Sequence, residues 1–207
     1  MKNNSFAIVF DFGGVLINWD PRFLYRKLFN GDEQAMERFL EEIRFFEWNA
    51  HQDAGRPFSE AVAELCGRFP QYCDLISAYD IRYEESLSEP IWPNVQILPI
   101  LKQAGYSLYG LSNWPDEKYS LVRPKYEFFD WFEDVIISGE VRLAKPDVRI
   151  FNLLLDRIRR RPNQCVLIDD SENNITVAEE LGFHTIHYRS TDQLKDELHR
   201  MTGVVLS

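Results

Sequence analysis

The sequence predicts an α/β protein, with a three-layer Rossmann-like core around a parallel sheet and a small inserted helical domain. Apolar runs that end in polar loops alternate along the chain with segments of helical periodicity, as they do in doubly wound sheets. The alternation stops once, over residues 16–88, where aromatic, leucine and acidic residues recur at helical spacing. We therefore expect a core of residues 1–15 and 89–207, and a helical cap over residues 16–88.

The first expected strand is the apolar run 6–10, which ends at Asp11. Because it is apolar on every residue rather than on alternate ones, it suits a strand that is buried on both faces. Further strands of this design are expected at 107–111, 135–137 and 165–168, with a weaker one at 185–188.

Helices are expected between these runs and throughout the insert. Gly182 is a natural C-cap, and Ser59 is a candidate N-cap. Residues 53–57 are expected to form an irregular link between helices of the insert. The helices are predicted at 21–29, 33–46, 59–69, 72–87, 93–103, 118–125, 147–160 and 172–181.

Composition limits the possible partners. A chain of 207 residues with 45% apolar and 14% aromatic residues has enough apolar surface for one packed core. Its formal charge of −10 repels polyanions, so no nucleic-acid partner is expected. No apolar stretch reaches membrane-spanning length, and the run 6–10 is too short for a signal peptide. We therefore expect no membrane partner.

The cysteines bear on cellular location. Cys66, Cys73 and Cys165 contain no CxxC pair and are odd in number. Neither a disulfide framework nor a zinc site is expected from this pattern. A reducing, cytoplasmic location fits it best.

Several polar residues stand directly after the predicted strands and should meet at one edge of the sheet, because ligands bind there in parallel sheets. Asp11 precedes Gly13 and Gly14, and Asp169 and Asp170 come after a later strand. Taken singly, these residues have plain structural explanations as a turn or a helix cap. Together, three carboxylates at one edge would repel one another unless a cation such as Mg²⁺ neutralised them.

Three more polar residues are candidates for a functional site. Lys145 stands just before Pro146, which is expected to start a helix, and Ser112 and Asn113 end a strand. A surface lysine and two turn residues are the plain alternatives. The order and spacing of all four elements favour the functional interpretation.

In that order the four elements resemble the motifs of the haloacid dehalogenase superfamily, over roughly the whole chain. Residues 10–16 match the first motif with its nucleophilic aspartate, and 111–116 resemble the second. Lys145 with Pro146 matches the third, and 168–174 are similar to the metal-binding fourth. The helical insert falls where this superfamily carries its cap. The resemblance is strongest to the branch of alpha-glucose-1-phosphate phosphatase and the phosphatase domain of soluble epoxide hydrolase.

The resemblance implies a magnesium-dependent phosphomonoesterase that acts on a small phosphorylated metabolite, such as a sugar phosphate. Asp11 would attack phosphorus and form an aspartyl-phosphate, with Ser112 and Lys145 as the other catalytic residues. Mg²⁺ would be held by Asp11, the Gly13 carbonyl and Asp170, with Asp169 direct or through water. The expected substrate-binding residues are Phe12, Gly13, Ser112, Asn113, Lys145 and Asn174 in the core, and Trp19, Trp48 and His51 on the cap side.

One residue departs from the superfamily pattern. Gly13 stands where most of these phosphatases carry a second aspartate that protonates the leaving oxygen, and loss of such an acid typically costs about 10²- to 10⁴-fold in rate. The substrate could have a good leaving group, or the protein could retain binding with little turnover. A cap residue or bound water could also substitute, and His51, Asp53 and Asp20 are the candidate residues.

Other functions are compatible with the same residues. A phosphate-binding or regulatory protein on a degenerate core is the main alternative, and a metal-independent 2-haloacid dehalogenase is another. A mutase is disfavoured because it relies on the acid that Gly13 replaces. Asn49 and Trp114 join the cap-side residues as candidates for substrate contact, although packing would equally explain the aromatic ones.

Overall fold

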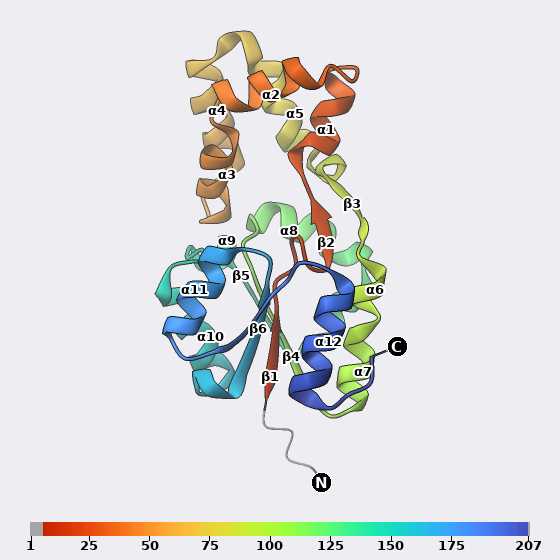
Figure 1. Ribbon diagram of the computed structural model, residues 1–207. Helices are drawn as coiled ribbons and strands as arrows, with labels where there is room; N and C mark the ends of the chain where they lie inside the picture. Colours follow the sequence, from red (N-terminus) through yellow and green to blue (C-terminus); the bar gives the residue numbers. More distant parts are fainter. Residues whose placement is uncertain (1–5, 207) are drawn as a thin grey trace.

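The computed structural model describes residues 6–206. Its core is a five-stranded parallel sheet of order β5-β4-β1-β6-β7 (Figure 1). The predicted α/β fold with a parallel sheet is therefore confirmed. The strands of this sheet are β1 (Ala7–Phe10), β4 (Ser107–Ser112), β5 (Asp134–Ile137), β6 (Cys165–Asp169) and β7 (His184–His187).

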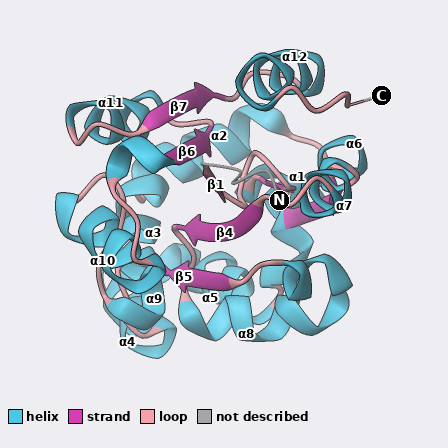
Figure 2. Ribbon diagram, turned by 90° about the horizontal axis from the view of Figure 1, so that it is seen from below, coloured by secondary structure: helices cyan, strands magenta, loops and turns pink. Residues whose placement is uncertain are grey.

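Strand β1 lies at the centre of the sheet and is buried along its whole length. Because successive side chains point to opposite faces, Ala7 and Val9 join one apolar cluster, and Ile8 and Phe10 join the other. Helices α10 and α11 cover the first face, whereas α7 and α12 cover the second (Figure 2). The helices of the core are α6 (Trp92–Val95), α7 (Ile97–Gln103), α8 (Asp116–Val122), α9 (Ser138–Val141), α10 (Val148–Ile158), α11 (Glu172–Glu180) and α12 (Thr191–Thr202).

A group of helices lies beyond the carboxyl ends of the strands (Figure 1). The chain enters it through β2 (Ile17–Trp19) and returns through β3 (Leu87–Pro90), and these two strands pair antiparallel. The insert thus joins the core through a two-stranded ribbon. Its helices are α1 (Pro21–Leu28), α2 (Glu33–Glu42), α3 (Phe45–Asp53), α4 (Phe58–Arg68) and α5 (Cys73–Ile81), followed by the 3₁₀ turn η2 (Tyr83–Ser86).

Several predicted helix boundaries in the insert were wrong. The single helix expected over 33–46 is two helices, because Arg44 adopts a left-handed conformation (φ 53°) between them. Ser59 caps nothing: α4 begins one residue earlier, after Pro57. The helix expected over 72–87 ends at Ile81, and the chain continues into η2 and β3.

The core shows one similar difference. Pro146 was expected to begin a helix, but α10 begins at Val148, where the Asp147 carboxylate accepts a hydrogen bond from the Arg149 backbone N–H at 2.9 Å. The N-cap of this helix is therefore Asp147, which had been expected inside the helix.

The insert is docked onto the core through α8. The Lys118 ammonium donates to the Asp80 carbonyl of α5 at 2.9 Å, pairs with the Asp80 carboxylate, and lies 4.2 Å from the centroid of the Phe58 ring. The Phe58 N–H donates to the neighbouring Glu117 carboxylate at 3.3 Å. Only 5% of the Lys118 side chain is exposed, so this contact closes one side of the junction between insert and core.

The expectations drawn from the cysteines and from hydropathy had different outcomes. Cys66 and Cys73 form a disulfide, with a sulfur–sulfur distance of 2.19 Å, so the expectation of no disulfide was wrong. The turn between α4 and α5 brings these residues together, which a search for CxxC pairs does not detect. Cys165 is buried and free. Among the described helices, none combines the length and apolar character needed to cross a bilayer.

Candidate active site

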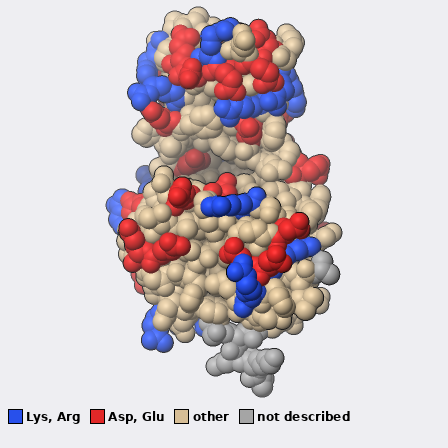
Figure 3. All heavy atoms as spheres, in the orientation of Figure 1, with Lys and Arg blue, Asp and Glu red and all other residues tan. Residues whose placement is uncertain are grey.

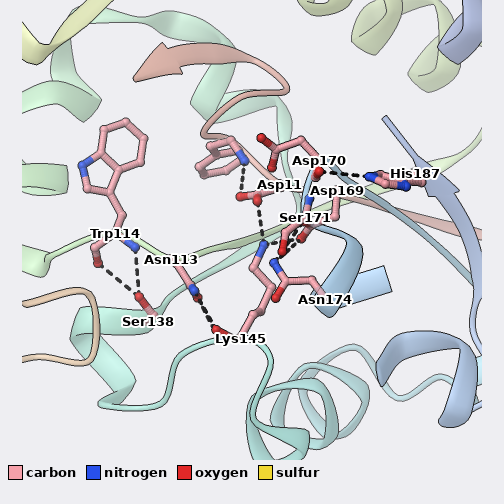
Figure 4. A network of polar contacts seen from close by, with 11 residues as sticks. Asp11, Asn113, Trp114, Ser138, Lys145, Asp169, Asp170, Ser171, Asn174 and His187 are labelled. Atoms are coloured by element: carbon pink, nitrogen blue, oxygen red, sulfur yellow. Dashed lines mark hydrogen bonds and ion pairs between the residues drawn. The ribbon is translucent and has the colours of Figure 1, made fainter. Parts of the chain in front are cut away.

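The polar residues at the ends of the strands meet at the edge of the sheet that faces the insert (Figure 4). Asp11 comes directly after β1. Its backbone N–H donates to the Ile168 carbonyl of β6 at 2.9 Å, which continues the hydrogen bonding between these two strands. Ser112 ends β4 and Asp169 ends β6. Parallel strands thus bring together residues that are up to 158 positions apart in the chain.

Lys145 is the cation at the centre of this group. Its ammonium lies 2.8 Å from a carboxylate oxygen of Asp11 and 2.6 Å from one of Asp169. The side chain is completely buried. The plain alternative of a surface lysine is therefore wrong.

The two carboxylates at the end of β6 have different surroundings. Asp169 is fully buried and accepts hydrogen bonds from Lys145, from the Asn174 amide at 3.0 and 3.1 Å, and from the Ser171 N–H at 2.9 Å. Asp170 is exposed at the pocket. Asp170 is thus the freer of the two for an external ligand.

Gly14 allows Asp170 to approach the first loop. It has a φ of +71°, a conformation that residues with a side chain rarely adopt. A Cβ atom built on Gly14 would overlap the Asp170 carboxylate. The glycine therefore lets Asp170 stand directly against the loop that begins at Asp11.

Burial and mutual repulsion shift the proton affinities of these groups. Burial raises the pKa of Asp11 to about 7, against the opposing charge of Lys145 and with the support of Asp169 and Asp170. Although Asp170 is open at the pocket, partial burial of its carboxyl group, with the Asp169 charge, also raises its pKa. Burial lowers the pKa of Lys145, but Asp11 and Asp169 more than offset it, so the net shift is upward. The ammonium thus stays charged beside these carboxyl groups.

The three carboxylates fit a divalent metal ion. One oxygen each from Asp11, Asp169 and Asp170 can be chosen so that all three lie within 4.8 Å of one another. Three formal negative charges face one buried ammonium, and hard oxygen donors of this kind suit Mg²⁺. A bound cation would relieve the repulsion among these carboxylates, which adds to burial in raising the pKa values of Asp11 and Asp170.

Asn113 is occupied in a way that its place in the sequence does not reveal. Its amide oxygen accepts from the Lys145 backbone N–H, and its amide nitrogen donates to the Lys145 carbonyl, both at 2.8 Å. The resemblance implied that this amide would hold phosphate. In the structure it pairs with the backbone of Lys145, the residue that carries the buried ammonium, and Asn113 also lines the pocket described below.

Ser112 has the opposite character. Its hydroxyl is buried and has no hydrogen-bond partner among residues 6–206. An unsatisfied buried hydroxyl normally costs about 1–3 kcal/mol. A phosphate oxygen could supply the missing partner.

A pocket of about 250 Å³ opens at this edge, between the core and the insert. Figure 3 shows the molecule hollowed at this level, with acidic side chains inside the hollow. The pocket holds both polar groups and aromatic walls, so it suits a small, partly polar molecule. Its lining is Gly13, Gly14, Ile17, Trp19, Asn49, Asp53, Tyr83, Leu87, Asn113, Trp114 and Asp170.

Three residues expected at the substrate turn elsewhere. The Phe12 ring is buried in the core against Phe129 and Phe132, so only its backbone is near the site. Trp48 is buried in the insert and donates to the Ala61 carbonyl at 3.2 Å. His51, expected in a polar loop, is an exposed residue of α3.

The remaining expected residues have defined positions. Trp19, Asn49 and Trp114 line the pocket. Asn174 contacts Asp169 rather than the pocket, in keeping with a role in orienting that loop. Among the three candidates for a proton donor, only Asp53 lines the pocket, and Asp20 instead caps α1.

Tyr83 and Leu87 line the pocket, although their sequence did not predict it, and Ser138 bonds to two of the residues that line it. Tyr83 and Leu87 come after α5, and nothing in a helical pattern shows that they reach the pocket. The Ser138 hydroxyl accepts from the Trp114 N–H at 2.9 Å and donates to the Asp53 carbonyl. Its position at the end of a predicted strand was a signal that could have identified it.

The chain matches a known protein family and several known proteins. Residues 7–182 match the family described as haloacid dehalogenase-like hydrolases. Over 226 aligned residues the chain is 30% identical to bifunctional epoxide hydrolase 2 of Sus scrofa, covering 97% of the chain and 39% of that protein. The chain thus spans about two fifths of this relative.

A named bacterial phosphatase and a bacterial crystal structure each match over nearly their full length. D-ribitol-5-phosphate phosphatase of Bacteroides thetaiotaomicron is 23% identical, over 92% of the chain and 95% of that protein. A crystal structure of a family enzyme from the same organism, in complex with magnesium and inorganic phosphate, is 26% identical, with a TM-score of 0.67. That match covers 89% of this chain and 94% of the other.

Proposed function

Because the chain belongs to the haloacid dehalogenase-like hydrolase family, we propose that it is a magnesium-dependent phosphatase of small phosphorylated metabolites. The reaction is hydrolysis of a phosphate monoester through an aspartyl-phosphate on Asp11. Several relatives are named as phosphatases, and one related structure contains magnesium and inorganic phosphate.

One observation supports this proposal most strongly. A buried ammonium, Lys145, bridges the expected nucleophile Asp11 and Asp169, while Asp170 remains free at the pocket. This arrangement joins a positive charge for phosphate oxygens to a carboxylate set for a hard cation. A turn, a cap and a surface lysine, taken separately, would not require such a meeting.

Each residue of the site has its own part in the reaction. An Asp11 oxygen attacks phosphorus while the ester bond to the leaving oxygen breaks, and water later hydrolyses the aspartyl-phosphate. Lys145 and the Ser112 hydroxyl hold phosphate oxygens, and Asn113 and Asn174 hold Lys145 and Asp169 in place. Asp11, Asp170 and the Gly13 carbonyl would bind Mg²⁺, with Asp169 direct or through water. When bound, the ion neutralises charge that builds up on the phosphoryl oxygens.

The helical insert would supply substrate selection. We propose that residues 1–15 and 89–207 form the catalytic core and residues 16–88 a cap, with Trp19 and Asn49 facing the non-phosphate part of the substrate. A pocket of about 250 Å³ suits a small metabolite such as a sugar phosphate. The cytoplasmic location stays a prediction, and the Cys66–Cys73 disulfide counts against the cysteine argument for it.

The test is release of inorganic phosphate from an aryl phosphate and a panel of phosphorylated metabolites, with and without Mg²⁺. We expect release that depends on magnesium and is lost in Asp11→Asn, together with an acid-stable phosphate label on the native protein. Equal release by the variant, or none by the native protein across the panel, would leave phosphate binding as the function. Halide release from a 2-haloacid without metal would support a dehalogenase.

A further inference from the structure

A place for a proton donor is vacant beside the expected nucleophile. Gly13 lies two residues after Asp11 and lines the pocket. A Cβ atom built there would meet no described atom within 4 Å, apart from its chain neighbours. The loop therefore has room for an acid that the sequence does not place there.

Asp53 brings a carboxyl group to the same pocket from the insert. It is the last residue of α3 and lines the pocket together with Gly13 and Asp170. It is partly accessible through the pocket, although protein atoms surround it closely. The acid missing from the core thus has a counterpart on the opposite wall.

Neighbouring side chains fix the direction of Asp53. One carboxyl oxygen, Oδ2, accepts a hydrogen bond from the side-chain nitrogen of Asn49 at 3.0 Å. The side-chain oxygen of Asn49 in turn accepts a hydrogen bond from the Tyr79 hydroxyl at 3.0 Å. Both Asn49 and Tyr79 are buried. This chain of hydrogen bonds holds one side of the carboxyl group, whereas Oδ1 forms no hydrogen bond with another described residue.

The backbone of Asp53 is tied to the core as well. Its carbonyl accepts a hydrogen bond from the Ser138 hydroxyl of α9. Close by, a Cβ atom on Gly55, whose φ is +91°, would lie 2.8 Å from the Gly139 carbonyl. The absence of a side chain at Gly55 thus allows the end of α3 to dock against the core.

We propose that Asp53 is the acid and base of this reaction and takes the place of the aspartate that Gly13 lacks. As Asp11 bonds to phosphorus and the ester P–O bond breaks, Asp53 Oδ1–H gives its proton to the departing oxygen, which leaves as an alcohol. The Asp53 carboxylate then accepts a proton from the water that attacks the aspartyl-phosphate. That step frees inorganic phosphate and restores both side chains.

The surroundings of Asp53 suit this role. Burial raises the pKa of Asp53 to about 7, and the Asn49 hydrogen bond opposes the shift. The titratable groups that face it are Tyr79 and Tyr83, whose pKa values burial raises well above the usual range, and Asp170 across the pocket. Near neutral pH the carboxyl group can thus both give and accept a proton.

This inference rests on the proposed function, and leaving-group dependence tests it. We expect Asp53→Asn to slow hydrolysis of an alkyl phosphate about 10²-fold or more, because an alkoxide needs a proton to leave. The rate of the first burst of p-nitrophenol from p-nitrophenyl phosphate should change less than about threefold, because that phenolate leaves unprotonated. The phosphoenzyme should accumulate in the variant. The control is Glu47→Gln, an exposed carboxylate on the same helix.

A second variant separates chemistry from structure. Gly13→Asp added to Asp53→Asn should raise the rate on the alkyl phosphate at least about tenfold above that of Asp53→Asn alone, because the space at Gly13 accepts a side chain. Two results would overturn the inference and leave the proposed function standing. One is an unchanged rate of alkyl phosphate hydrolysis in Asp53→Asn. The other is an equal loss of rate on the alkyl and the aryl phosphate that Gly13→Asp does not restore. Absence of magnesium-dependent release by the native protein would overturn both.

Discussion

The side chain of Asn113 forms two hydrogen bonds, each 2.8 Å long, with the backbone N–H and carbonyl of Lys145. The amide thus pairs with the third motif much as one strand pairs with its neighbour. Because the ammonium of Lys145 lies between Asp11 and Asp169, this pairing sets the position of the main positive charge in the site.

Asn113→Ala should therefore lower kcat by about 10- to 100-fold, because a displacement of about 1 Å in a catalytic group can cost that much. Asn113→Asp keeps the acceptor but loses the donor, so it should fall between the native protein and the alanine variant. Steady-state kinetics would measure both, with the exposed Asn152→Ala of α10 as the control. Native activity in Asn113→Ala would contradict a positioning role.

Gly14→Ala should weaken magnesium binding. The new methyl group would overlap the Asp170 carboxylate and would require a strained φ of +71°. We expect the magnesium concentration for half-maximal activity to rise at least about tenfold. Gly67→Ala, a helical glycine with open space around it, is the matched control. An unchanged magnesium requirement would show that Asp170 does not bind the metal.

Ser112→Ala should separate stability from activity. The buried hydroxyl lacks a partner among the described residues, so its removal should leave the free energy of unfolding unchanged or raise it by up to about 1 kcal/mol. Loss of a hydrogen bond to a charged phosphate should reduce kcat/KM about 10- to 100-fold. Urea unfolding and kinetics would be compared with the exposed Ser120→Ala. A variant that is both less stable and fully active would contradict this view.

Asp53→Asn should stabilise the protein at alkaline pH. Burial raises the pKa of Asp53 from 3.8 to about 7. Its stabilising contribution is therefore fully present below about pH 4 and is lost as pH rises through 7. At pH 8 the folded native protein bears a buried carboxylate that asparagine avoids.

We expect urea unfolding to show the Asn variant about 1–3 kcal/mol more stable at pH 8, and nearly equal to the native protein at about pH 3.5. This range allows for the partial access of water to the carboxyl group. A difference that is independent of pH would indicate that hydrogen bonding, rather than burial of charge, distinguishes the two side chains.

Much of the fold could be predicted because its signals are local. An apolar run such as 165–168 identifies a buried strand, and a parallel sheet places the residues after each strand at one edge. Sequence alone thus predicts Asp11, Ser112 and Asp169 on the same edge, where the register of β1, β4 and β6 does place them. Lys145 needed the order of all four motifs, because a single lysine carries no such signal.

The insert was less predictable because helical spacing shows that one face of a helix is buried. It does not show whether that face packs within the insert or faces the pocket. Trp48 and Trp19 look alike in sequence, yet one packs within the insert and the other lines the pocket. The pairing of Asn113 with the Lys145 backbone was not predictable for a related reason: it depends on a neighbour 32 residues away. The disulfide, likewise, depends on a turn between two helices.

The pairing of β2 with β3 has a consequence for how the sequence of this protein can evolve. The chain passes from the core to the insert and back through this one ribbon. The residues proposed to bind and attack the phosphate group all belong to the core. Replacement of residues in α1–α5 can thus alter which molecules are accepted while the apparatus for breaking the ester is conserved. Asp53, in the last turn of α3, is the exception, because this one side chain both lines the pocket and is proposed to supply the proton.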